Sequence, residues 1–306
     1  MILSICVNPA IDYYVETESF RAGALNAIQN KRIMCGGKGV NFALAAKHLG
    51  FDCVAGGFMG RNKAAFEKML GSLSIGYKFI DCEGEIRTNI KILSGDGVIT
   101  ELNEKGFEVS EAAQSELLKL ADELDIDMLI CCGSLSPGMK EDYYYRLAGA
   151  AGPKVKFACD CEKSALISSL RANPFLIKPN RYELETVFAT ELKTYADIIK
   201  AARMLVTKGA QNVLVSLGKS GAIIVNGASA FYAQYTQGIE VLNQCGSGDA
   251  MFAAACDVFR KGGNLIEMLT AGVVAGTLAV NSRSLAAMDM GKAAEIRKNV
   301  KVEAIS

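Results

Sequence analysis

Short apolar segments of strand-like composition alternate with segments whose apolar residues recur at helical spacing, and this alternation continues along nearly the whole chain. Such alternation is typical of βα units around a mostly parallel sheet. The sequence predicts sheet strands at Ile2–Val7, Cys53–Phe58, Met128–Cys132, Lys156–Cys159, Phe175–Ile177, Asn212–Ser216 and Ala222–Val225. It predicts helices at Asn41–Leu49, Ala64–Leu73, Glu111–Glu123, Glu141–Ala150, Tyr195–Thr207, Asp249–Arg260 and Leu265–Val280.

Two segments depart from this alternation. Residues 11–34 are polar and strand-like, without helical spacing. Residues 88–107 are typical of a hairpin, because alternating apolar and polar residues flank the turn dipeptide Asp96-Gly97. We expect these segments to form a small β-layer with one solvated face at the edge of the core. No Pro- or Ser-rich linker divides the chain, so we expect a single α/β domain over residues 1–306.

The composition argues against several classes of protein. The 306 residues include 33 Lys and Arg against 33 Asp and Glu, so the net charge is zero. Without a net positive field or a basic run, the chain is a poor partner for nucleic acid or anionic lipid. The longest uncharged stretch, Ser220–Ile239, is too polar to span a bilayer, and the first residues do not resemble a secretory signal. We therefore expect a cytoplasmic protein with no nucleic-acid or membrane partner.

The cysteines and the single histidine limit the chemistry further. The ten cysteines are scattered, several lie in apolar segments, and no C-x-x-C spacing occurs. This distribution favours reduced core thiols over a disulfide framework or a zinc site. His48 lies near the end of a predicted helix, and no G-x-S-x-G sequence exists for it to serve. Catalysis by a Ser-His-Asp or Cys-His arrangement is therefore not expected.

Three glycine-rich or polar segments hold most of the candidate chemistry. The first is Gly-Gly-Lys-Gly-Val-Asn at residues 36–41, where a helix begins. Glycines let a ligand approach the backbone, and a helix N-terminus offers free N–H groups to hydroxyls or a phosphate. The segment does not satisfy the Walker A pattern. A tight turn into a helix explains it equally well.

The second segment is Lys-Pro-Asn-Arg-Tyr-Glu-Leu at residues 178–184. Asn180 and Glu183 have the spacing of a reciprocal helix cap, which is the simpler explanation of the segment in isolation. The same amide and carboxylate at a strand-to-helix turn are also suited to hold hydrated Mg²⁺ near nucleotide phosphates.

The third segment is Gly-Ser-Gly-Asp at residues 246–249, at the start of an apolar helix. Successive N–H groups there would form an anion hole, and the helix dipole favours a transferring phosphoryl group. Asp249 is suited to accept the proton of an attacking hydroxyl, although an acid at a helix N-terminus is also favourable for stability alone. Met251 stands where the dinucleotide-binding pattern needs its third glycine, which argues against a nicotinamide dehydrogenase.

Taken in order, these segments resemble the ribokinase-like (PfkB) carbohydrate kinase family over essentially the whole chain, and within it the 1-phosphofructokinase and tagatose-6-phosphate kinase branch. The matching motifs are Val7–Asp12, Gly36–Asn41, Ile86–Lys91, Cys132–Gly138, Lys178–Leu184, Val215–Ala222 and Asn243–Asp249. The resemblance implies a three-layer α/β/α core with a mostly parallel sheet. It also implies that a small β-sheet lid, from about residues 11–34 and 88–107, closes over the sugar.

The resemblance implies roles for individual residues. Sugar hydroxyls would be bound by Asp12, Gly37, Lys38 and Asn41, and the sugar side of the pocket would be lined by Ser134. The existing phosphate of the substrate would be bound by Arg87, Asn89 and Lys91. Nucleotide phosphates and Mg²⁺ would be arranged by Lys178, Asn180 and Glu183, and the nucleotide would be bordered by Ser216, Gly218 and Gly221. The anion hole would be formed by Gly246, Ser247 and Gly248, with Asp249 as the general base.

The reaction implied is ATP-dependent phosphorylation of a ketohexose phosphate, with Mg²⁺ as cofactor and a homodimer as a candidate assembly. Fructose 1-phosphate, phosphorylated at O6, is the leading substrate, and tagatose 6-phosphate is the alternative. A kinase of an unphosphorylated sugar or nucleoside, and a catalytically silent sugar-binding protein on the same scaffold, stay open. The chain departs from the family pattern at Gln244, Cys245 and Ala250, and at Ala27, where phospho-sugar members often carry arginine.

Overall fold

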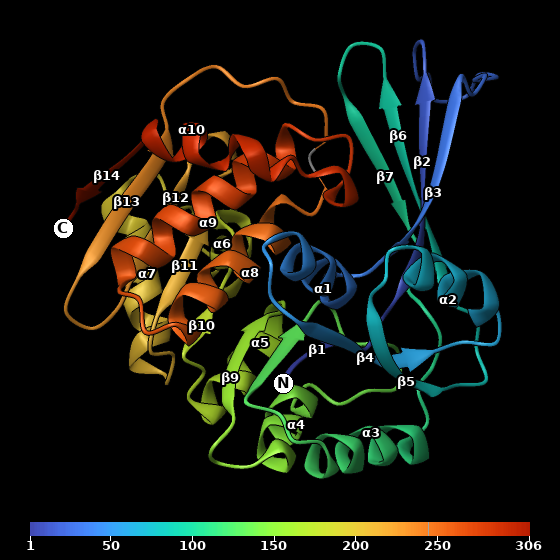
Figure 1. The fold of residues 1–306 in the computed structure, drawn as a ribbon, viewed down its shortest axis with the longest axis horizontal. Helices are drawn as coiled ribbons and strands as arrows, with labels where there is room; N and C mark the ends of the chain where they lie inside the picture. The colour runs from blue at the N-terminus through green and yellow to red at the C-terminus, as the bar shows by residue number, and fades with distance from the viewer. Residues whose placement is uncertain (244) are drawn as a thin grey trace.

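The computed structural model describes residues 1–243 and 245–306, and its strands form two separate sheets (Figure 1). The large sheet has ten strands in the order β14-β13-β12-β11-β10-β9-β8-β1-β4-β5. Their bounds are β1 Ile2–Cys6, β4 Cys53–Met59, β5 Gly76–Asp81, β8 Met128–Cys132, β9 Lys156–Asp160, β10 Leu176–Ile177, β11 Val213–Ser216, β12 Ala222–Val225, β13 Ala230–Tyr235 and β14 Val300–Ala304. Strands β5 to β11 in this order are parallel, and β12, β13 and β14 are antiparallel additions.

Every predicted core strand is present, with ends that differ from the prediction by no more than one residue. Two strands escaped the prediction, and both lie at the edges of the sheet: β5 and β14. Most of their residues are exposed or half-buried, so their apolar pattern is weak. Strand β13 falls within Ser220–Ile239, the uncharged stretch that is too polar to span a bilayer.

Helices cover both faces of the large sheet (Figure 1). Successive helices α3 to α7 neighbour one another in one row, and α1, α8, α9 and α10 form another. Their bounds are α1 Lys38–His48, α2 Lys63–Ser72, α3 Glu111–Glu123, α4 Tyr143–Ala151, α5 Lys163–Ser169, α6 Arg181–Phe188, α7 Tyr195–Thr207, α8 Ser247–Arg260, α9 Leu265–Val280 and α10 Ala293–Lys298. The two helical layers and the sheet between them form the three-layer α/β/α arrangement.

Two helices begin two or three residues earlier than predicted, and both starts matter for the site. Helix α1 begins at Lys38 rather than Asn41, and α8 begins at Ser247 rather than Asp249. The N-cap residues are Gly37, with φ of 105°, and Gly246, with φ of 81°. Only glycine adopts such backbone angles without strain, so each helix starts immediately after its glycine. Gln244, one of the positions that departs from the family pattern, lies outside the described residues.

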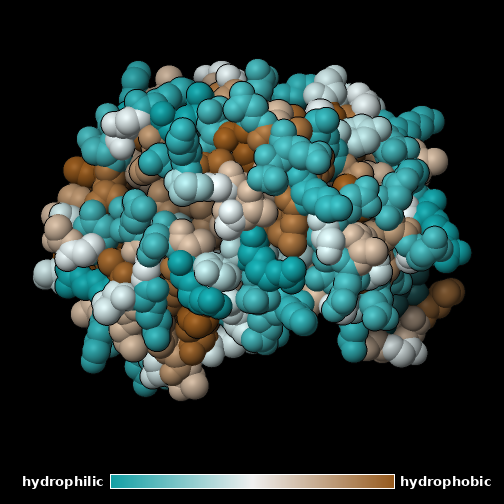
Figure 2. All heavy atoms as spheres, turned by 90° about the horizontal axis from the view of Figure 1, so that it is seen from below, coloured by the Kyte–Doolittle hydropathy of each residue, from teal (hydrophilic) through white to brown (hydrophobic). Residues whose placement is uncertain are grey.

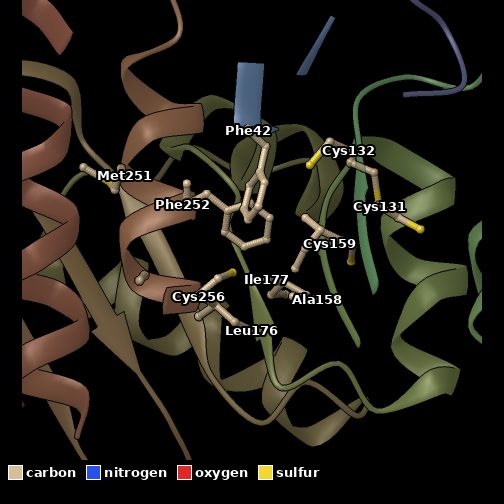
Figure 3. Packing of buried hydrophobic residues seen from close by; sticks show 14 of the residues in the cluster. Phe42, Cys131, Cys132, Ala158, Cys159, Leu176, Ile177, Met251, Phe252 and Cys256 are labelled. Atoms are coloured by element: carbon tan, nitrogen blue, oxygen red, sulfur yellow. The ribbon is translucent and has the colours of Figure 1, made fainter. Parts of the chain in front are cut away.

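An aromatic contact fixes α1 against α8. The rings of Phe42 and Phe252 meet edge to face with centroids 5.7 Å apart, in the fully buried core between the two helices (Figure 3). Cys132, Cys159 and Cys256 lie in the same cluster, and all ten cysteines of the chain are free thiols, seven of them buried. Because this contact holds the two helices together, it also brings their N-terminal turns side by side.

The small sheet has the order β3-β2-β6-β7 and extends beyond the large one (Figure 1). Its strands are β2 Ala10–Thr17, β3 Asn30–Gly36, β6 Arg87–Ser94 and β7 Ile99–Asn103, all within or next to the two segments predicted as a lid. Strands β2 and β6 are parallel, a pairing that the sequence did not reveal. The register puts Asp12 beside Asn89 and Tyr14 beside Lys91, so these four side chains share one face.

The molecular surface carries few continuous apolar areas. On the face shown in Figure 2, hydrophobic residues occur in small groups among hydrophilic ones. Within residues 1–243 and 245–306, no helix combines the length and hydropathy that a membrane span requires.

Candidate active site

A cavity of about 520 Å³ lies at the carboxyl ends of the parallel strands. Its lining includes residues from the ends of five neighbouring strands: Asn8 after β1, Ser134 after β8, Asp160 of β9, Lys178 after β10 and Ser216 of β11. The chain order reverses between β1 and β8, because β4 and β5 follow β1 on one side and β9 to β11 follow β8 on the other. Open α/β sheets bind ligands at such a switch point.

Most of the predicted site residues line this one cavity. They are Asp12, Gly37, Lys38, Asn41, Arg87, Asn89, Lys91, Ser134, Lys178, Asn180, Ser216, Gly246, Gly248 and Asp249. The large sheet and the small sheet therefore both contribute to the lining of the same cavity.

Four predicted residues lie outside the cavity lining: Glu183, Gly218, Gly221 and Ser247. Gly218 and Gly221 belong to the turn between β11 and β12. Gly221 has φ of 86°, and a Cβ there would collide with the carbonyl oxygen of Ala233, so the hairpin itself requires glycine. A nucleotide-binding role is not needed to explain that residue.

Glu183 forms the predicted helix cap. Its Oε2 accepts a hydrogen bond from the backbone N–H of Asn180 at 2.8 Å, and Asn180 Oδ1 accepts one from the backbone N–H of Glu183. The other carboxylate oxygen, Oε1, lies 3.6 Å from Lys38 Nζ. Burial raises the pKa of Glu183, and the ammonium of Lys38 opposes that rise. The capping role and the electrostatic role are therefore filled by different oxygens of the same residue.

Asp249 occupies the first turn of α8 and is buried. Its Oδ2 accepts a hydrogen bond of 2.8 Å from Asn41 Nδ2, which belongs to the first turn of α1. Burial, followed by the negative charge of Asp160, raises the pKa of Asp249 above its ordinary value. A raised pKa makes a carboxylate a better proton acceptor than a free aspartate.

Asp160 is a central residue of the site that the sequence analysis missed. It is almost fully buried, and its two carboxylate oxygens each lie 2.9 Å from an ammonium group, that of Lys38 on one side and that of Lys178 on the other. Burial opposes ionisation of Asp160, but the two lysines hold its pKa below the ordinary value. Asp160 raises the pKa of Lys38 in turn, against the effect of burial. The only sequence signal was an acid at the end of a predicted strand.

The ammonium of Lys178 lies against the N-terminus of α8. A Cβ built on Gly248 would be 3.2 Å from Lys178 Nζ, so the absence of a side chain at Gly248 leaves the lysine room beside the backbone N–H groups. A fixed positive charge and a helix N-terminus then face the same part of the cavity. This arrangement suits a phosphoryl group with developing negative charge.

The wall formed by the small sheet is a hydrogen-bonded group around Asp12. Its Oδ1 accepts from Asn89 Nδ2 at 2.9 Å and its Oδ2 accepts from Lys91 Nζ at 2.8 Å. Lys91 also donates to the hydroxyl of Tyr14 at 3.2 Å. The charge of Lys91 is thus already paired inside the protein, and Asp12 raises its pKa although burial opposes this.

Arg87 lines the cavity and is held by backbone carbonyls. Its guanidinium donates to the carbonyl oxygens of Asn8 at 3.2 Å and Glu104 at 3.0 Å. Within the described part of the chain, buried Arg87 Nε and Asn89 Oδ1 have no hydrogen-bond partner. Unsatisfied buried groups beside a cavity are costly unless a ligand or water engages them.

The cavity is lined by charged side chains of both signs. Four cations line it, Lys38, Arg87, Lys91 and Lys178, together with five carboxylates, Asp12, Glu101, Asp160, Glu162 and Asp249. The lysines are paired with carboxylates instead of projecting free charge. Phosphate groups that bind here must therefore share lysines with acids of the protein.

A cavity at the carboxyl ends of a parallel sheet, with two lysines, a helix N-terminus and a buried carboxylate, has the features of a phosphoryl-transfer site. The chain belongs to the PfkB family of carbohydrate kinases, whose model matches residues 1–290. It is therefore an ATP-dependent phosphotransferase that acts on a carbohydrate.

Individual relatives agree with this assignment. A 1-phosphofructokinase of Borreliella burgdorferi is 34% identical over 280 residues, which cover 90% of this chain and 91% of the relative. A D-tagatose-1-phosphate kinase of Bacillus licheniformis is 32% identical over 289 residues, which cover 93% of this chain and 94% of the relative. A crystal structure of phosphofructokinase-2 from Escherichia coli in complex with potassium superimposes with a TM-score of 0.90 at 25% identity, covering 97% of this chain and 98% of that one.

Proposed function

We propose that the chain phosphorylates fructose 1-phosphate on O6, with ATP as donor and fructose 1,6-bisphosphate and ADP as products. The observation that carries this proposal is the position of Asp249. Its carboxylate is buried in the first turn of α8, has a raised pKa and accepts a hydrogen bond from Asn41. The 34% identity to a 1-phosphofructokinase supports the choice of sugar.

The chemistry follows from the positions of these groups. Asp249 takes the proton of the O6 hydroxyl as O6 forms its bond to the γ-phosphorus of ATP. The bond from that phosphorus to the bridging oxygen of the β-phosphate breaks, and ADP leaves. Backbone N–H groups at residues 246–248 and the ammonium of Lys178 stabilise the charge on the transferred group. Asn41 keeps the carboxylate oriented toward the acceptor hydroxyl.

Magnesium fits this site as a partner of the nucleotide. Among residues 1–243 and 245–306, no group of three or more His, Cys, Asp or Glu side chains is arranged to hold a metal ion by itself. Mg²⁺ in kinases is held by one or two carboxylates together with phosphate oxygens and water. Glu183, with Oε1 directed toward Lys38, is the carboxylate that would serve that purpose, because both oxygens of Asp160 are already paired with lysines. When bound, the ion supplies positive charge that neutralises the phosphates.

The phosphate that the sugar already carries is assigned to Arg87. Lys91 is paired with Asp12 at 2.8 Å, so it contributes less free charge than its sequence position implied. Arg87 has an unpartnered Nε within the described residues and lines the cavity. Its planar guanidinium is suited to bind two phosphate oxygens at once.

The proposal is tested by measuring ADP release with fructose 1-phosphate, fructose 6-phosphate, tagatose 1-phosphate, tagatose 6-phosphate, ribose and adenosine. We expect the highest kcat/KM with fructose 1-phosphate. Tagatose 1-phosphate enters the panel because a relative carries that substrate in its name. Tagatose 6-phosphate as the best substrate would replace the assignment by the alternative from the sequence. No turnover with any of the six sugars and nucleosides would contradict a kinase function.

A kinase of an unphosphorylated sugar is the second candidate, because the carboxylates that line the cavity outnumber its cations. Arg87→Ala separates the two functions. If the substrate carries a phosphate, this variant should lose at least about 100-fold in kcat/KM for it, while activity on ribose stays unchanged. An equal loss for phosphorylated and neutral sugars would indicate that Arg87 only supports the backbone around Asn8 and Glu104.

A homodimer is the assembly we propose, formed through the outer face of the small sheet. Strand register aligns Ile33, Tyr13, Ile90 and Leu102 in one row across its four strands, on the face opposite Asp12. Ile33 is 44% exposed and Leu102 is 54% exposed, so the row is open in a single copy. A second copy that packs its own row here would remove this apolar surface from water. Ile33→Glu should convert a dimer into a monomer in analytical ultracentrifugation, and a wild-type monomer would contradict the proposal.

The location we propose is the cytoplasm. Ten free thiols, most of them buried, are typical of proteins in a reducing compartment. Cell fractionation tests this, and recovery of the protein from an oxidising compartment would contradict it.

A further inference from the structure

Asp160 connects two parts of the cavity to which different ligands were assigned. Lys38 comes from the first residue of α1, on the side expected to bind sugar, and Lys178 follows β10, on the side expected to bind nucleotide. Both ammonium groups lie 2.9 Å from Asp160, and each approaches a different oxygen of its carboxylate. The end of β9 thereby links the two halves of the site through one buried side chain.

Stability does not explain this carboxylate. Transferring ions from water into a protein interior costs several kcal/mol for each ion, and a buried pair recovers this only with good geometry. A carboxylate in an anion-binding cavity also lowers the net positive charge that phosphates meet. The arrangement is understandable if the placement of the two lysines matters more than the strength of their attraction for the nucleotide.

We propose that Asp160 is a positioning residue that fixes the ammonium groups of Lys38 and Lys178 on either side of its carboxylate. Held there, the two lysines contact the phosphoryl group during its transfer, instead of moving to bind the phosphates of the nucleotide before the reaction. This inference rests on the proposed kinase function. Interactions accelerate a reaction only when they are stronger in the transition state than with the bound substrates. Lysines released from Asp160 would bind the ground-state phosphates more tightly and lose that difference.

The surroundings of Asp249 provide an independent readout. The charged and polar groups that face it are Asp160 from β9, Lys38 and Asn41 from α1, Lys178 after β10 and Cys132 from β8. Removing the negative charge of Asp160 leaves both lysines unopposed beside Asp249. The loss of the nearby negative charge and the unopposed lysines both favour the ionised form of Asp249 and so lower its pKa. The acidic limb of the pH–rate profile should therefore move to lower pH.

The test compares Asp160→Asn with the wild-type enzyme. We expect kcat to fall by at least about 100-fold, as when one preorganised electrostatic contact is removed. Affinity for ADP, measured by calorimetry because the chain has no tryptophan, should stay the same or increase. The acidic limb of kcat/KM should shift down by about one pH unit.

Asp257→Asn is the matched control. Asp257 also holds two cations, Arg260 at 2.7 Å and Lys261, but it lies on α8 away from the cavity. This variant should keep the kcat, the ADP affinity and the pH profile of the wild type. A general effect of removing a carboxylate between two cations would appear in both variants.

Asp160→Glu keeps the charge and shifts it by one methylene, and the adjacent cavity offers room for the longer side chain. Position rather than charge is then altered, so kcat should fall by at least about tenfold while the acidic limb stays at the wild-type pH. This variant also decides the matter if Asp160→Asn does not fold. Wild-type kcat in the folded variants, or ADP affinity that falls in step with kcat, would overturn the inference.

Failure of this inference is distinguishable from failure of the proposed function. If the wild type turns over a sugar phosphate but Asp160 variants are equally active, only the positioning role is wrong. If the wild type turns over nothing, the proposed function is wrong, and the ADP affinities of wild type and Asp160→Asn still test whether the carboxylate restrains the lysines. A weaker affinity in the variant would then contradict the restraint.

Discussion

Replacing Lys91 by methionine should leave a buried carboxylate without its ion-pair partner. The side chain of Lys91 is 12% exposed and that of Asp12 is 6% exposed, and the two groups are 2.8 Å apart. Methionine keeps most of the aliphatic volume but removes the positive charge. The carboxylate of Asp12 then retains Asn89 as a hydrogen-bond donor but loses the ammonium.

The size of the effect follows from the burial. Removing one partner of a buried ion pair costs about 3–5 kcal/mol, because the other charge stays desolvated. At an unfolding entropy of about 2.1 cal/mol/K per residue, this loss lowers the melting temperature of a 306-residue chain by about 5–8 °C.

The assay is thermal and urea unfolding of Lys91→Met beside two further variants. Lys63→Met breaks an ion pair with Asp81 whose side chains are 36% and 69% exposed, and it should change the stability little, because water screens the pair. The double variant Asp12→Asn with Lys91→Met removes both charges and should recover most of the stability lost by Lys91→Met alone.

Two results would refute the reasoning. Lys91→Met would be no more destabilising than Lys63→Met if water reaches the Asp12 carboxylate freely. The double variant would be as unstable as Lys91→Met if the loss came from packing and not from an unpaired charge. The first outcome would mean that Lys91 is available to a ligand rather than committed to Asp12.

Three further predictions concern glycines, helix caps and pH. Gly39→Ala should destabilise the fold by about 2–3 kcal/mol, because the new Cβ would lie 2.5 Å from a backbone carbonyl of β1. Gly71→Ala, in open space on α2, should instead stabilise the fold by about 0.5–1 kcal/mol. Equal effects of the two variants in urea unfolding would contradict the close approach at Gly39. Asn180→Ala and Asn264→Ala each remove a capping-box residue and should each cost about 1 kcal/mol, but only Asn180→Ala should raise KM for ATP. The pKa of Asp249 is raised in the folded protein. Ionisation of Asp249 therefore lowers the stability of the fold once the pH exceeds the pKa of a free aspartate. Asp249→Asn should therefore melt at a higher temperature than wild type near neutral pH, with a difference that narrows as the pH falls toward about 4; a constant difference would contradict the raised pKa.

The interior of the fold was predictable from sequence because buried parallel strands carry continuous apolar runs. Every residue of β1 and β8 is buried, and both segments were identified. The edge strands β5 and β14 were missed because half-exposed strands have no such run. The parallel pairing of β2 with β6 joins residues 77 positions apart, and no local pattern encodes it.

The site was partly predictable for a similar reason. Glycines and caps that start helices leave short, recognisable signatures, and these led to Lys38, Asn41, Asn180 and Asp249. Asp160 had no such signature. Asp81 also ends a strand, yet it is 69% exposed and pairs with a surface lysine. Only the three-dimensional position, between two lysines, distinguishes a catalytic-site acid from a surface one.

Gly221 has two explanations that a sequence cannot separate. The family motif assigns this glycine to the nucleotide, and its positive φ and the nearby carbonyl of Ala233 also explain it through the β11–β12 turn. A sequence motif does not separate residues that bind a ligand from residues that shape the backbone around it.

The most direct test of the central claim is steady-state ADP release by Asp249→Asn, with Asp257→Asn on the same helix as control. Calorimetry of sugar phosphate and ADP binding should give wild-type affinities for both variants. The account predicts that Asp249→Asn binds both ligands yet loses at least about 100-fold in kcat with fructose 1-phosphate, while Asp257→Asn keeps the wild-type rate. Near-normal turnover by Asp249→Asn would contradict its role as the base.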